Sequence, residues 1–289
     1  MLIELIKSFR IRQWTKNIVV FAAIVFDRQL MNPASLGRSV LGFFVFCLVS
    51  SSIYIINDIL DIHEDRLHPT KRYRPIASGK LPLPIAIAAW IVLLVISIPA
   101  GFWLSPWFGF VLLVYIGINV LYSKWLKHIP IIDVMVIAAG FVLRVGAGVT
   151  LIHVERFSPW LYLVILFGAL LLGFGKRRAE LASIANHNNL QRKVLDGYAL
   201  NYLDYLLIVV STATIMAYSL YTFSAPNMPA NHSMMLTIPF VLYGIFRYLY
   251  IIHVEQKGES PEDLLITDRP IQITILAWGI TVVLIFYIL

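Results

Sequence analysis

Long apolar runs, separated by shorter polar stretches, dominate the chain from about residue 17 to its C-terminal end. Several runs approach twenty residues, the length that a helix needs to cross the hydrocarbon core of a bilayer. Breaks at proline, glycine and charged residues divide them into nine candidate spans. The spans begin near residues 17, 37, 83, 106, 130, 158, 204, 233 and 271. The pattern predicts an all-α, polytopic membrane helix bundle forming a single domain over residues 1–289.

Two polar loops interrupt this pattern, at residues 57–82 and 175–203, and each follows an even-numbered span. Residues 1–16 mix apolar and basic positions, so we expect an amphipathic arm lying on the membrane surface. Composition supports the membrane assignment, since 59% of residues are hydrophobic and only 13% are charged. The single cysteine, Cys47, excludes an internal disulfide.

Lysine and arginine are distributed unevenly between the two sides that nine spans define. Most of the 23 basic residues fall in the N-terminal arm and in the loops on its side. Loops rich in lysine and arginine remain in the cytoplasm. We therefore expect an integral protein of the cell (inner) membrane, with the N-terminus and both polar loops cytoplasmic and the C-terminus outside. This bias explains the net charge of +7 without a nucleic-acid partner.

The first polar loop opens with the acidic stretch "NDILDIHED", residues 57–65. On a helix, five oxygen-bearing side chains share an arc of roughly 120°: Asn57, Asp58, Asp61, Glu64 and Asp65. A solvated helix end is the alternative, but the C-terminal end of a helix favours lysine or arginine over acids. Grouped carboxylates are favourable when a divalent cation bridges them, and Mg²⁺ combines a few protein oxygens with substrate phosphates. The stretch therefore predicts a site for a metal-bound diphosphate.

A basic stretch, "HPTKRYRPIASGK", follows the acids and supplies Lys71, Arg72 and Arg74. Arginine offers phosphate a planar fork and lysine a point charge. Acids for a metal beside cations for phosphate oxygens indicate one polyanionic substrate. Attraction to the membrane surface is the alternative for the basic part.

These residues resemble a known family. "NDILDIHED" is similar to the NDxxDxxxD motif of the UbiA-type prenyltransferase superfamily, whose members are helical membrane enzymes that bind a diphosphate through Mg²⁺ at the cytoplasmic side. The continuation "HPTKRYRPIASG", with "RQWTKN", "YSKWLKHIPIIDVMVIAAGFVLR" and "GKRRAEL", looks most like the polyprenyl-phosphate phosphoribosyltransferase branch. The resemblance covers nearly the whole chain.

The resemblance implies transfer of 5-phosphoribose from 5-phosphoribosyl 1-diphosphate to a polyprenyl phosphate such as decaprenyl phosphate, a step toward lipid-linked pentose donors for cell-envelope glycan. Mg²⁺ is the implied cofactor, held by Asp58, Asp61 and Asp65, the catalytic acids, with help from Asn57. The residues expected to bind substrate are Lys16, Asn57, Lys71, Arg72, Arg74, Tyr122, Lys127, Asp133, Arg144, Lys176, Arg177 and Glu180.

The second polar loop departs from the aromatic prenyltransferases, which usually carry a second Asp-rich motif there. This loop opens with cations, and its acids Asp196 and Asp204 stand eight residues apart, so a complete second metal site is not expected. Extra cations suit a substrate pair with more phosphate. Lys176 and Glu180 could instead pair on a helix surface. We expect Arg177 at the loop's edge, where its replacement by alanine would leave folding intact.

Two charges lie within the span near residue 130. Asp133 and Arg144 differ by eleven positions, which places them on one helix face but about 16 Å apart along the axis. Each therefore needs its own partner. Asp133 is expected to contact the donor or orient Lys127, whereas helix packing and contact with the lipid phosphate stay open for Arg144.

Two other functions stay open. An aromatic prenyltransferase would use the same first motif with a polyprenyl diphosphate, and a membrane transporter would also have many spans and buried charges. The sequence does not fix the oligomeric state, and a homo-oligomer is possible.

Overall fold

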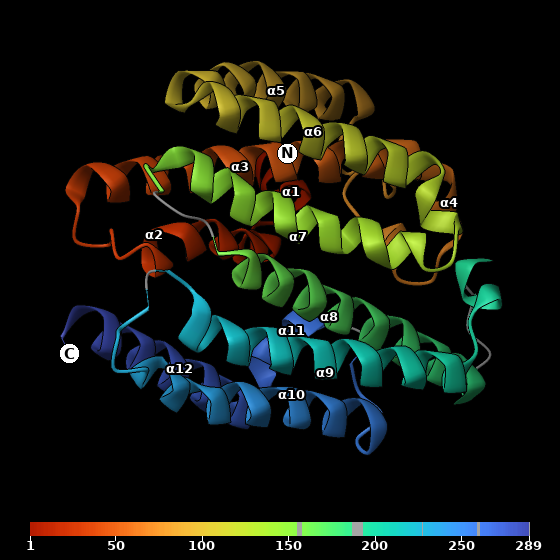
Figure 1. The fold of residues 1–289 in the computed structure, drawn as a ribbon. Helices are drawn as coiled ribbons and strands as arrows, with labels where there is room; N and C mark the ends of the chain where they lie inside the picture. The colour runs from red at the N-terminus through yellow and green to blue at the C-terminus, as the bar shows by residue number, and fades with distance from the viewer. Residues whose placement is uncertain (155–157, 187–192, 227, 259–260, 289) are drawn as a thin grey trace. The chain divides into compact units, whose positions relative to one another are not determined.

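The computed structural model describes residues 1–154, 158–186, 193–226, 228–258 and 261–288. Every regular element within these ranges is a helix (Figure 1), so the all-α expectation is confirmed. The chain divides into two compact units, a division that the hydropathy pattern did not indicate. Unit 1 comprises Met1–Trp125 and Leu143–Val154, and unit 2 comprises Leu126–Val142 and Glu155–Leu289.

Unit 1 is built on one long helix, α3, which packs along α5 and also contacts α6 and the 3₁₀ segment η1. Its elements are α1 (Leu2–Ser8), η1 (Ile11–Phe21), α2 (Ala22–Phe26), α3 (Pro33–Leu60), α4 (Ile62–Leu67), η2 (Lys71–Tyr73), α5 (Leu83–Leu104) and α6 (Pro106–Lys124), with the C-terminal part of α7 (Ile132–Leu151). Phe46, Phe108, Leu112 and Leu151 are buried together in its core.

Local sequence sets where the main helix of unit 1 begins and how closely α7 approaches η1. The Asn32 side chain accepts hydrogen bonds from the backbone N–H groups of Ala34 and Ser35, and Pro33 occupies the first helical position. Both features favour a helix start. Gly148 of α7 lies against the Val20 carbonyl, where any Cβ atom would collide. A glycine is therefore required for this contact between α7 and η1.

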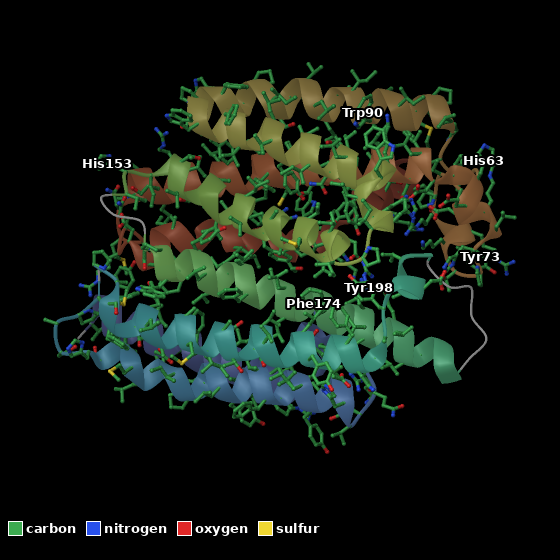
Figure 2. The ribbon with its side chains drawn as sticks, turned by 45° about the vertical axis from the view of Figure 1, so that its right-hand side comes forward. His63, Tyr73, Trp90, His153, Phe174 and Tyr198 are labelled. Atoms are coloured by element: carbon green, nitrogen blue, oxygen red, sulfur yellow. The ribbon has the colours of Figure 1, made fainter. Side chains whose placement is uncertain are left out.

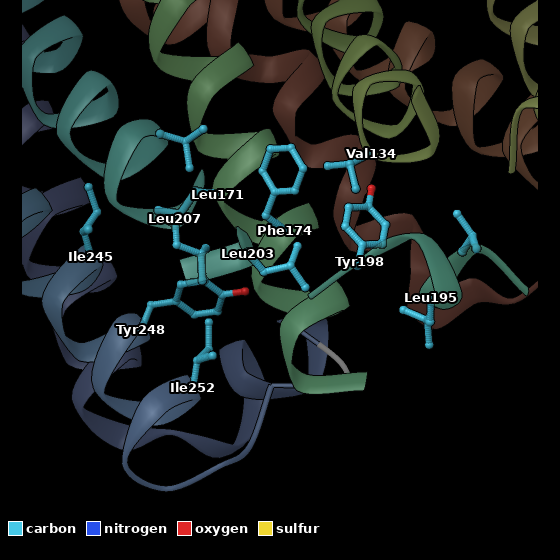
Figure 3. Packing of buried hydrophobic residues seen from close by; sticks show 12 residues of the cluster. Val134, Leu171, Phe174, Leu195, Tyr198, Leu203, Leu207, Ile245, Tyr248 and Ile252 are labelled. Carbon is cyan, nitrogen blue, oxygen red and sulfur yellow. The ribbon is translucent and has the colours of Figure 1, made fainter. Parts of the chain in front are cut away.

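Unit 2 pairs α8 with α9 and α10 with α12. Its elements are η3 (Leu126–His128), the N-terminal part of α7, α8 (Pro159–Asn186), η4 (Lys193–Gly197), α9 (Leu200–Ser224), η5 (Ser233–Thr237), α10 (Ile238–His253), α11 (Pro261–Thr267) and α12 (Arg269–Tyr287). Figure 3 shows the core: Phe174 of α8, Leu203 of α9 and Tyr248 of α10 lie among other buried apolar side chains, with Val134 of α7 beside Tyr198.

Among the described residues, eight helical segments are long and apolar enough to cross a membrane: Pro33–Leu60, Leu83–Leu104, Pro106–Lys124, Ile132–Leu151, Pro159–Ser183, Leu200–Ser224, Ser233–His253 and Arg269–Tyr287. They match eight of the nine expected spans. The expected span near residue 17 is instead η1 followed by the short helix α2, so the count of nine is not confirmed.

Both expected polar loops are partly helical. In 57–82, α3 continues to Leu60 and is followed by α4 and η2. In 175–203, α8 continues to Asn186, so Lys176, Arg177 and Glu180 lie on a helix rather than at a loop's edge; residues 187–192 lie outside the described ranges. The expected loop boundaries were wrong because both helices extend beyond their apolar runs into charged sequence.

Candidate active site

The acidic motif of unit 1 spans the junction between α3 and α4. A turn at Asp61 separates the two helices, but the Asp61 N–H still donates to the Asn57 carbonyl at 2.9 Å and the Asp65 N–H to the Asp61 carbonyl at 2.8 Å. These i to i+4 bonds keep the helical phase across the turn. The expectation that residues one helical turn apart share a face therefore holds for Asn57, Asp61 and Asp65.

Two carboxylates of the motif, those of Asp58 and Asp65, contact the same guanidinium group, that of Arg74. The Arg74 Nη1 atom lies 2.6 Å from Asp65 Oδ2 and 3.1 Å from Asp58 Oδ1. Arg10 also pairs with Asp58 and stacks over the Tyr54 ring, 4.9 Å from its centroid. Both aspartates are buried, whereas the two arginines are partly exposed. We call Arg10, Asp58, Asp65 and Arg74 the motif network.

Other expected residues lie on the same elements of unit 1. The Asn57 side-chain oxygen accepts a hydrogen bond from Ser123 Oγ at 2.6 Å, and the exposed Arg72 donates to the Tyr73 hydroxyl at 2.8 Å. The remaining expected residues here are half-buried: Lys16, Asp61, Lys71 and Tyr122. Figure 2 shows His63 of α4 and Tyr73 of η2 at one end of unit 1 and His153 at the other, which places the motif at a helix end.

Unit 2 holds a second group of charges, in which Asp133 and Arg177 are buried and Glu180 is partly exposed. Arg177 Nε lies 2.6 Å from Asp133 Oδ2, and Arg177 Nη1 lies 2.5 Å from Glu180 Oε2. The Tyr198 hydroxyl donates to Asp133 Oδ1 at 2.7 Å and accepts from the Ile131 N–H at 2.5 Å. We call Asp133, Arg177, Glu180 and Tyr198 the buried cluster.

Burial raises the pKa of Tyr198 above its ordinary value, and the hydrogen bond that it donates to Asp133 raises it further. Loss of the proton would leave two negative oxygens in contact away from water. The hydroxyl therefore remains protonated at neutral pH, and it acts as donor to the carboxylate and acceptor for the backbone.

Comparison with known proteins identifies the chain. The model of the UbiA prenyltransferase family matches residues 18–265. The chain belongs to the UbiA prenyltransferase family. The resemblance read from the motifs is thereby confirmed, and this UbiA-family chain is an integral membrane transferase. The transporter alternative is set aside.

Relatives of this UbiA-family chain are similar over most of their length. A protein of Mycolicibacterium smegmatis named decaprenyl-phosphate phosphoribosyltransferase is 37% identical, over 95% of this chain and 89% of the relative. A protein of the same name from Corynebacterium glutamicum is 33% identical, over 99% of this chain and 87% of the relative.

Solved structures show the same fold. A UbiA homolog from Archaeoglobus fulgidus, described as bound to DMAPP and Mg²⁺, superposes with a TM-score of 0.74 at 20% identity and covers 99% of this chain and 100% of its own. A homolog from Aeropyrum pernix superposes with a TM-score of 0.65 at 15% identity, covering 94% and 98%. At such low identity the likeness establishes the UbiA fold alone.

The motif network offers the kind of donor set that a divalent cation uses. Within the described ranges, no three histidine, cysteine or acidic side chains gather closely enough to hold a metal, so Asp58, Asp61 and Asp65 do not form the expected group here. Asp58 and Asp65 are instead ion-paired with arginines. Asp58 and Asp65 nevertheless both contact the Arg74 Nη1 atom, so the two carboxylates converge on one positive group, and carboxylate oxygens are the ligands Mg²⁺ prefers. The residues present therefore fit Mg²⁺.

Asp133 and Arg144 each have their own partners, as expected. Arg144 in unit 1 donates from Nε to Asn17 Oδ1 at 2.8 Å and from Nη2 to the Tyr115 hydroxyl at 2.6 Å, and it lies over the Phe46 ring. These internal contacts favour a packing role. Asp133 pairs with Arg177, a partner that the sequence analysis did not assign to it.

The acids of the second polar region do not form a pair. The Asp204 Oδ1 atom accepts from Arg178 Nε at 2.5 Å and lies 3.1 Å from His253 Nε2, whereas Asp196 is exposed. Glu180 pairs with Arg177 at i, i+3, rather than with Lys176, the partner at i, i+4 that was the alternative to substrate binding. The expectation that this region lacks a complete second metal site stays a prediction.

Sequence reasoning missed Arg10 and Tyr198. Arg10 was counted only as a topology charge, although it lies in the "FRIRQWTKN" stretch next to a quoted motif. It contacts Asp58 from 48 positions away. Tyr198 meets Asp133 across 65 positions, and no local pattern in the sequence links them.

Proposed function

We propose that this UbiA-family chain transfers 5-phosphoribose from 5-phosphoribosyl 1-diphosphate to a polyprenyl phosphate such as decaprenyl phosphate, giving polyprenyl-phosphoryl-5-phosphoribose and diphosphate. The names of its relatives at 33–37% identity support this reaction. The observation that carries the proposal is the motif network, in which the buried carboxylates of Asp58 and Asp65 both contact Arg74, and Asp58 also contacts Arg10.

Asn57, Asp58, Asp61 and Asp65 would hold Mg²⁺, which neutralises charge growing on a departing diphosphate when it is bound. Arg10 and Arg74 already lie against these carboxylates, and their planar guanidinium groups match phosphate oxygens. Cations that would bind further phosphates are Lys16, Lys71, Arg72, Lys127 and Lys176. Arg177 is assigned to the buried cluster rather than to a phosphate, because its guanidinium already contacts Asp133 and Glu180.

The acceptor chemistry places few demands on the protein. A lipid phosphate is already an anion, so its attack on the ribose carbon needs no strong general base. Tyr122 is assigned to substrate binding on the resemblance of "YSKWLKH". The exposed apolar side chains of the long helices would contact lipid and the polyprenyl chain.

The proposal includes a topology. The N-terminus and the acidic motif would face the cytoplasm and the C-terminus the outside, because basic residues concentrate on the motif's side. A cysteine introduced at Ser78 would then react with an impermeant thiol reagent only from the cytoplasmic side, and one at Asn231 only from outside. Labelling of both from the same side would contradict this topology.

The substrate assay uses the purified full chain in lipid vesicles with Mg²⁺ and radiolabelled 5-phosphoribosyl diphosphate. Polyprenyl phosphates of several chain lengths serve as acceptors, and a polyprenyl diphosphate with an aromatic acceptor serves as the competing pair. We expect a labelled lipid product only with the polyprenyl phosphates. Turnover of the polyprenyl diphosphate together with no pentosyl transfer would assign the chain to the aromatic prenyltransferases instead.

A further inference from the structure

A strained turn precedes α7. Ile131 has a φ of 70°, a left-handed conformation that a β-branched side chain rarely adopts. Among the five described non-glycine residues with positive φ, it is the one with a β-branched side chain. Such a conformation persists only where surrounding contacts hold it.

Tyr198 supplies such a contact. Its hydroxyl accepts a hydrogen bond from the Ile131 N–H at 2.5 Å and donates one to Asp133 Oδ1 at 2.7 Å. Asp133 is itself held by Arg177 Nε at 2.6 Å. Figure 3 shows the Tyr198 ring beside Val134, the residue that follows Asp133 in α7. One buried hydroxyl thus links the strained backbone to the first turn of α7.

The segment that carries Tyr198 also packs directly on the turn. η4 contacts η3, and a Cβ atom on Gly197 would collide with the Pro130 ring. The glycine therefore lets η4 approach closely enough for the neighbouring tyrosine hydroxyl to reach the Ile131 N–H. The contact of Gly197 with Pro130 and the hydrogen bond from the Ile131 N–H to the Tyr198 hydroxyl therefore both act on the backbone of this turn.

The turn is connected to Lys127. Within 126–133, the Ile129 N–H donates to the Leu126 carbonyl at 3.2 Å, and the Asp133 N–H donates to the Ile129 carbonyl at 3.0 Å. η3, which contains Lys127, is therefore joined to α7 through the backbone that bends at Ile131. A change in the Ile131 φ angle would reorient Lys127 relative to α7.

We propose that Tyr198 is a positioning residue: its hydroxyl holds the Ile131 turn in the left-handed conformation and so orients Lys127 for substrate phosphate. The role of Lys127 rests on the proposed function, whereas the hold on the turn does not. Tyr198 itself contacts no substrate in this scheme, and it acts through the backbone.

The test uses Tyr198→Phe in the full chain in lipid nanodiscs. Phenylalanine keeps the ring in the core but removes both hydrogen bonds, one of them to a charged group. We expect hydrogen exchange at the Ile131 amide to become about tenfold faster and kcat/KM for 5-phosphoribosyl diphosphate to fall roughly tenfold. Tyr205→Phe is the matched control, because Tyr205 is 66% exposed, and we expect it to change neither quantity.

A second variant separates positioning from general loosening. Glycine adopts positive φ without steric cost. Adding Ile131→Gly to Tyr198→Phe is therefore expected to raise kcat/KM about threefold above that of Tyr198→Phe alone, while hydrogen exchange at the amide of residue 131 stays fast. A general loss of packing would not be repaired by a more flexible backbone. Failure of glycine to restore any activity would overturn the positioning role.

The outcomes distinguish this inference from the proposed function. If the wild-type chain makes no pentosyl product, the proposed function fails, and the exchange rate at Ile131 still decides whether Tyr198 holds the turn. If the wild type is active and Tyr198→Phe matches Tyr205→Phe in both exchange and kcat/KM, the inference is wrong.

Discussion

The motif network and the buried cluster use the same pairing of arginine with aspartate but in different surroundings. In the motif network, the Arg10 and Arg74 side chains are 28% and 27% exposed. In the buried cluster, the Arg177 side chain is 2% exposed and Asp133 is fully buried. An arginine that reaches solvent can exchange its carboxylate partner for a ligand. If a buried arginine left its partner, the carboxylate would remain as an uncompensated charge inside the protein.

This difference separates two roles that look alike in the sequence. In the sequence, both regions contain acidic residues next to basic residues near the ends of apolar runs. Both were expected to bind substrate. From burial we propose ligand exchange for the motif network and internal support for the buried cluster. The comparison predicts opposite responses to mutation: loss of stability in the buried cluster and loss of activity in the motif network.

The largest effect is expected for Arg177→Ala. Removing one partner leaves Asp133 buried without its main countercharge, which typically costs about 3–5 kcal/mol of folding free energy. We expect low yield and a strongly reduced Tm in detergent. This replaces the expectation that folding would survive, which assumed a position at a loop's edge.

Two comparisons sharpen this result. Arg12→Ala removes an exposed arginine and should leave the free energy of unfolding within about 0.5 kcal/mol of wild type. The pair Arg177→Met with Asp133→Leu should destabilise less than Arg177→Ala, because it leaves no fully buried charge unpaired, and Glu180 is partly exposed to solvent. A Tm for Arg177→Ala equal to that of wild type would remove the distinction between the two regions.

The next effect is expected for Asp61→Asn in the acidic motif. The change keeps the side chain's size but removes a metal ligand, so turnover should fall by at least about tenfold, while the Tm stays near that of wild type because Asp61 is only half-buried. Glu64→Gln is the matched control, since Glu64 is exposed three residues away, and it should keep most activity. Equal rates for the two variants would place Asp61 outside the site.

Sequence pattern predicted most of the fold because transmembrane helices are encoded by the length of apolar runs. The expected span near residue 17 was not confirmed as one long apolar helix, because the run from Ile18 to Phe26 has nine residues before Asp27 and Arg28, fewer than the roughly twenty of a regular spanning helix. Its residues form η1 and α2 instead.

The site was predictable where its residues are neighbours in sequence. Helical spacing indicated that Asp58 and Asp65 share a face, and Arg74 follows Asp58 within seventeen positions, as a cation expected beside these acids. Arg177 and Tyr198 could not be placed this way, because their contacts with Asp133 span 44 and 65 positions. Contacts of that kind depend on how the helices pack, which local periodicity does not encode.

The smallest effect tests a third ion pair, between Arg247 and Asp268. Arg247 Nη2 lies 2.7 Å from Asp268 Oδ2, and Asp268 also caps α12 by accepting from the Ile271 N–H. The hydrogen bond from Arg247 lowers the pKa of Asp268 below its ordinary value. Its contribution to stability is therefore present at neutral pH and is lost as the pH falls through this lowered pKa.

Asp268→Asn keeps the capping oxygen and removes the charge. We expect a loss of about 1 kcal/mol or less at pH 7, and a Tm difference from wild type that shrinks as the pH falls below about 4, the ordinary aspartate value. A difference that grows on acidification would contradict the sign of the pKa shift.

The most direct test of the motif network's role is equilibrium binding of 5-phosphoribosyl diphosphate to the full chain in nanodiscs, titrated with and without Mg²⁺. If the network exchanges its arginine contacts for a metal-bound diphosphate, and Asp61 of the same motif helps to hold the metal, wild-type binding requires Mg²⁺ and weakens at least about tenfold in Asp61→Asn, while Glu64→Gln binds as wild type does. Donor binding that is equally tight without Mg²⁺, or unchanged in Asp61→Asn, would contradict this role.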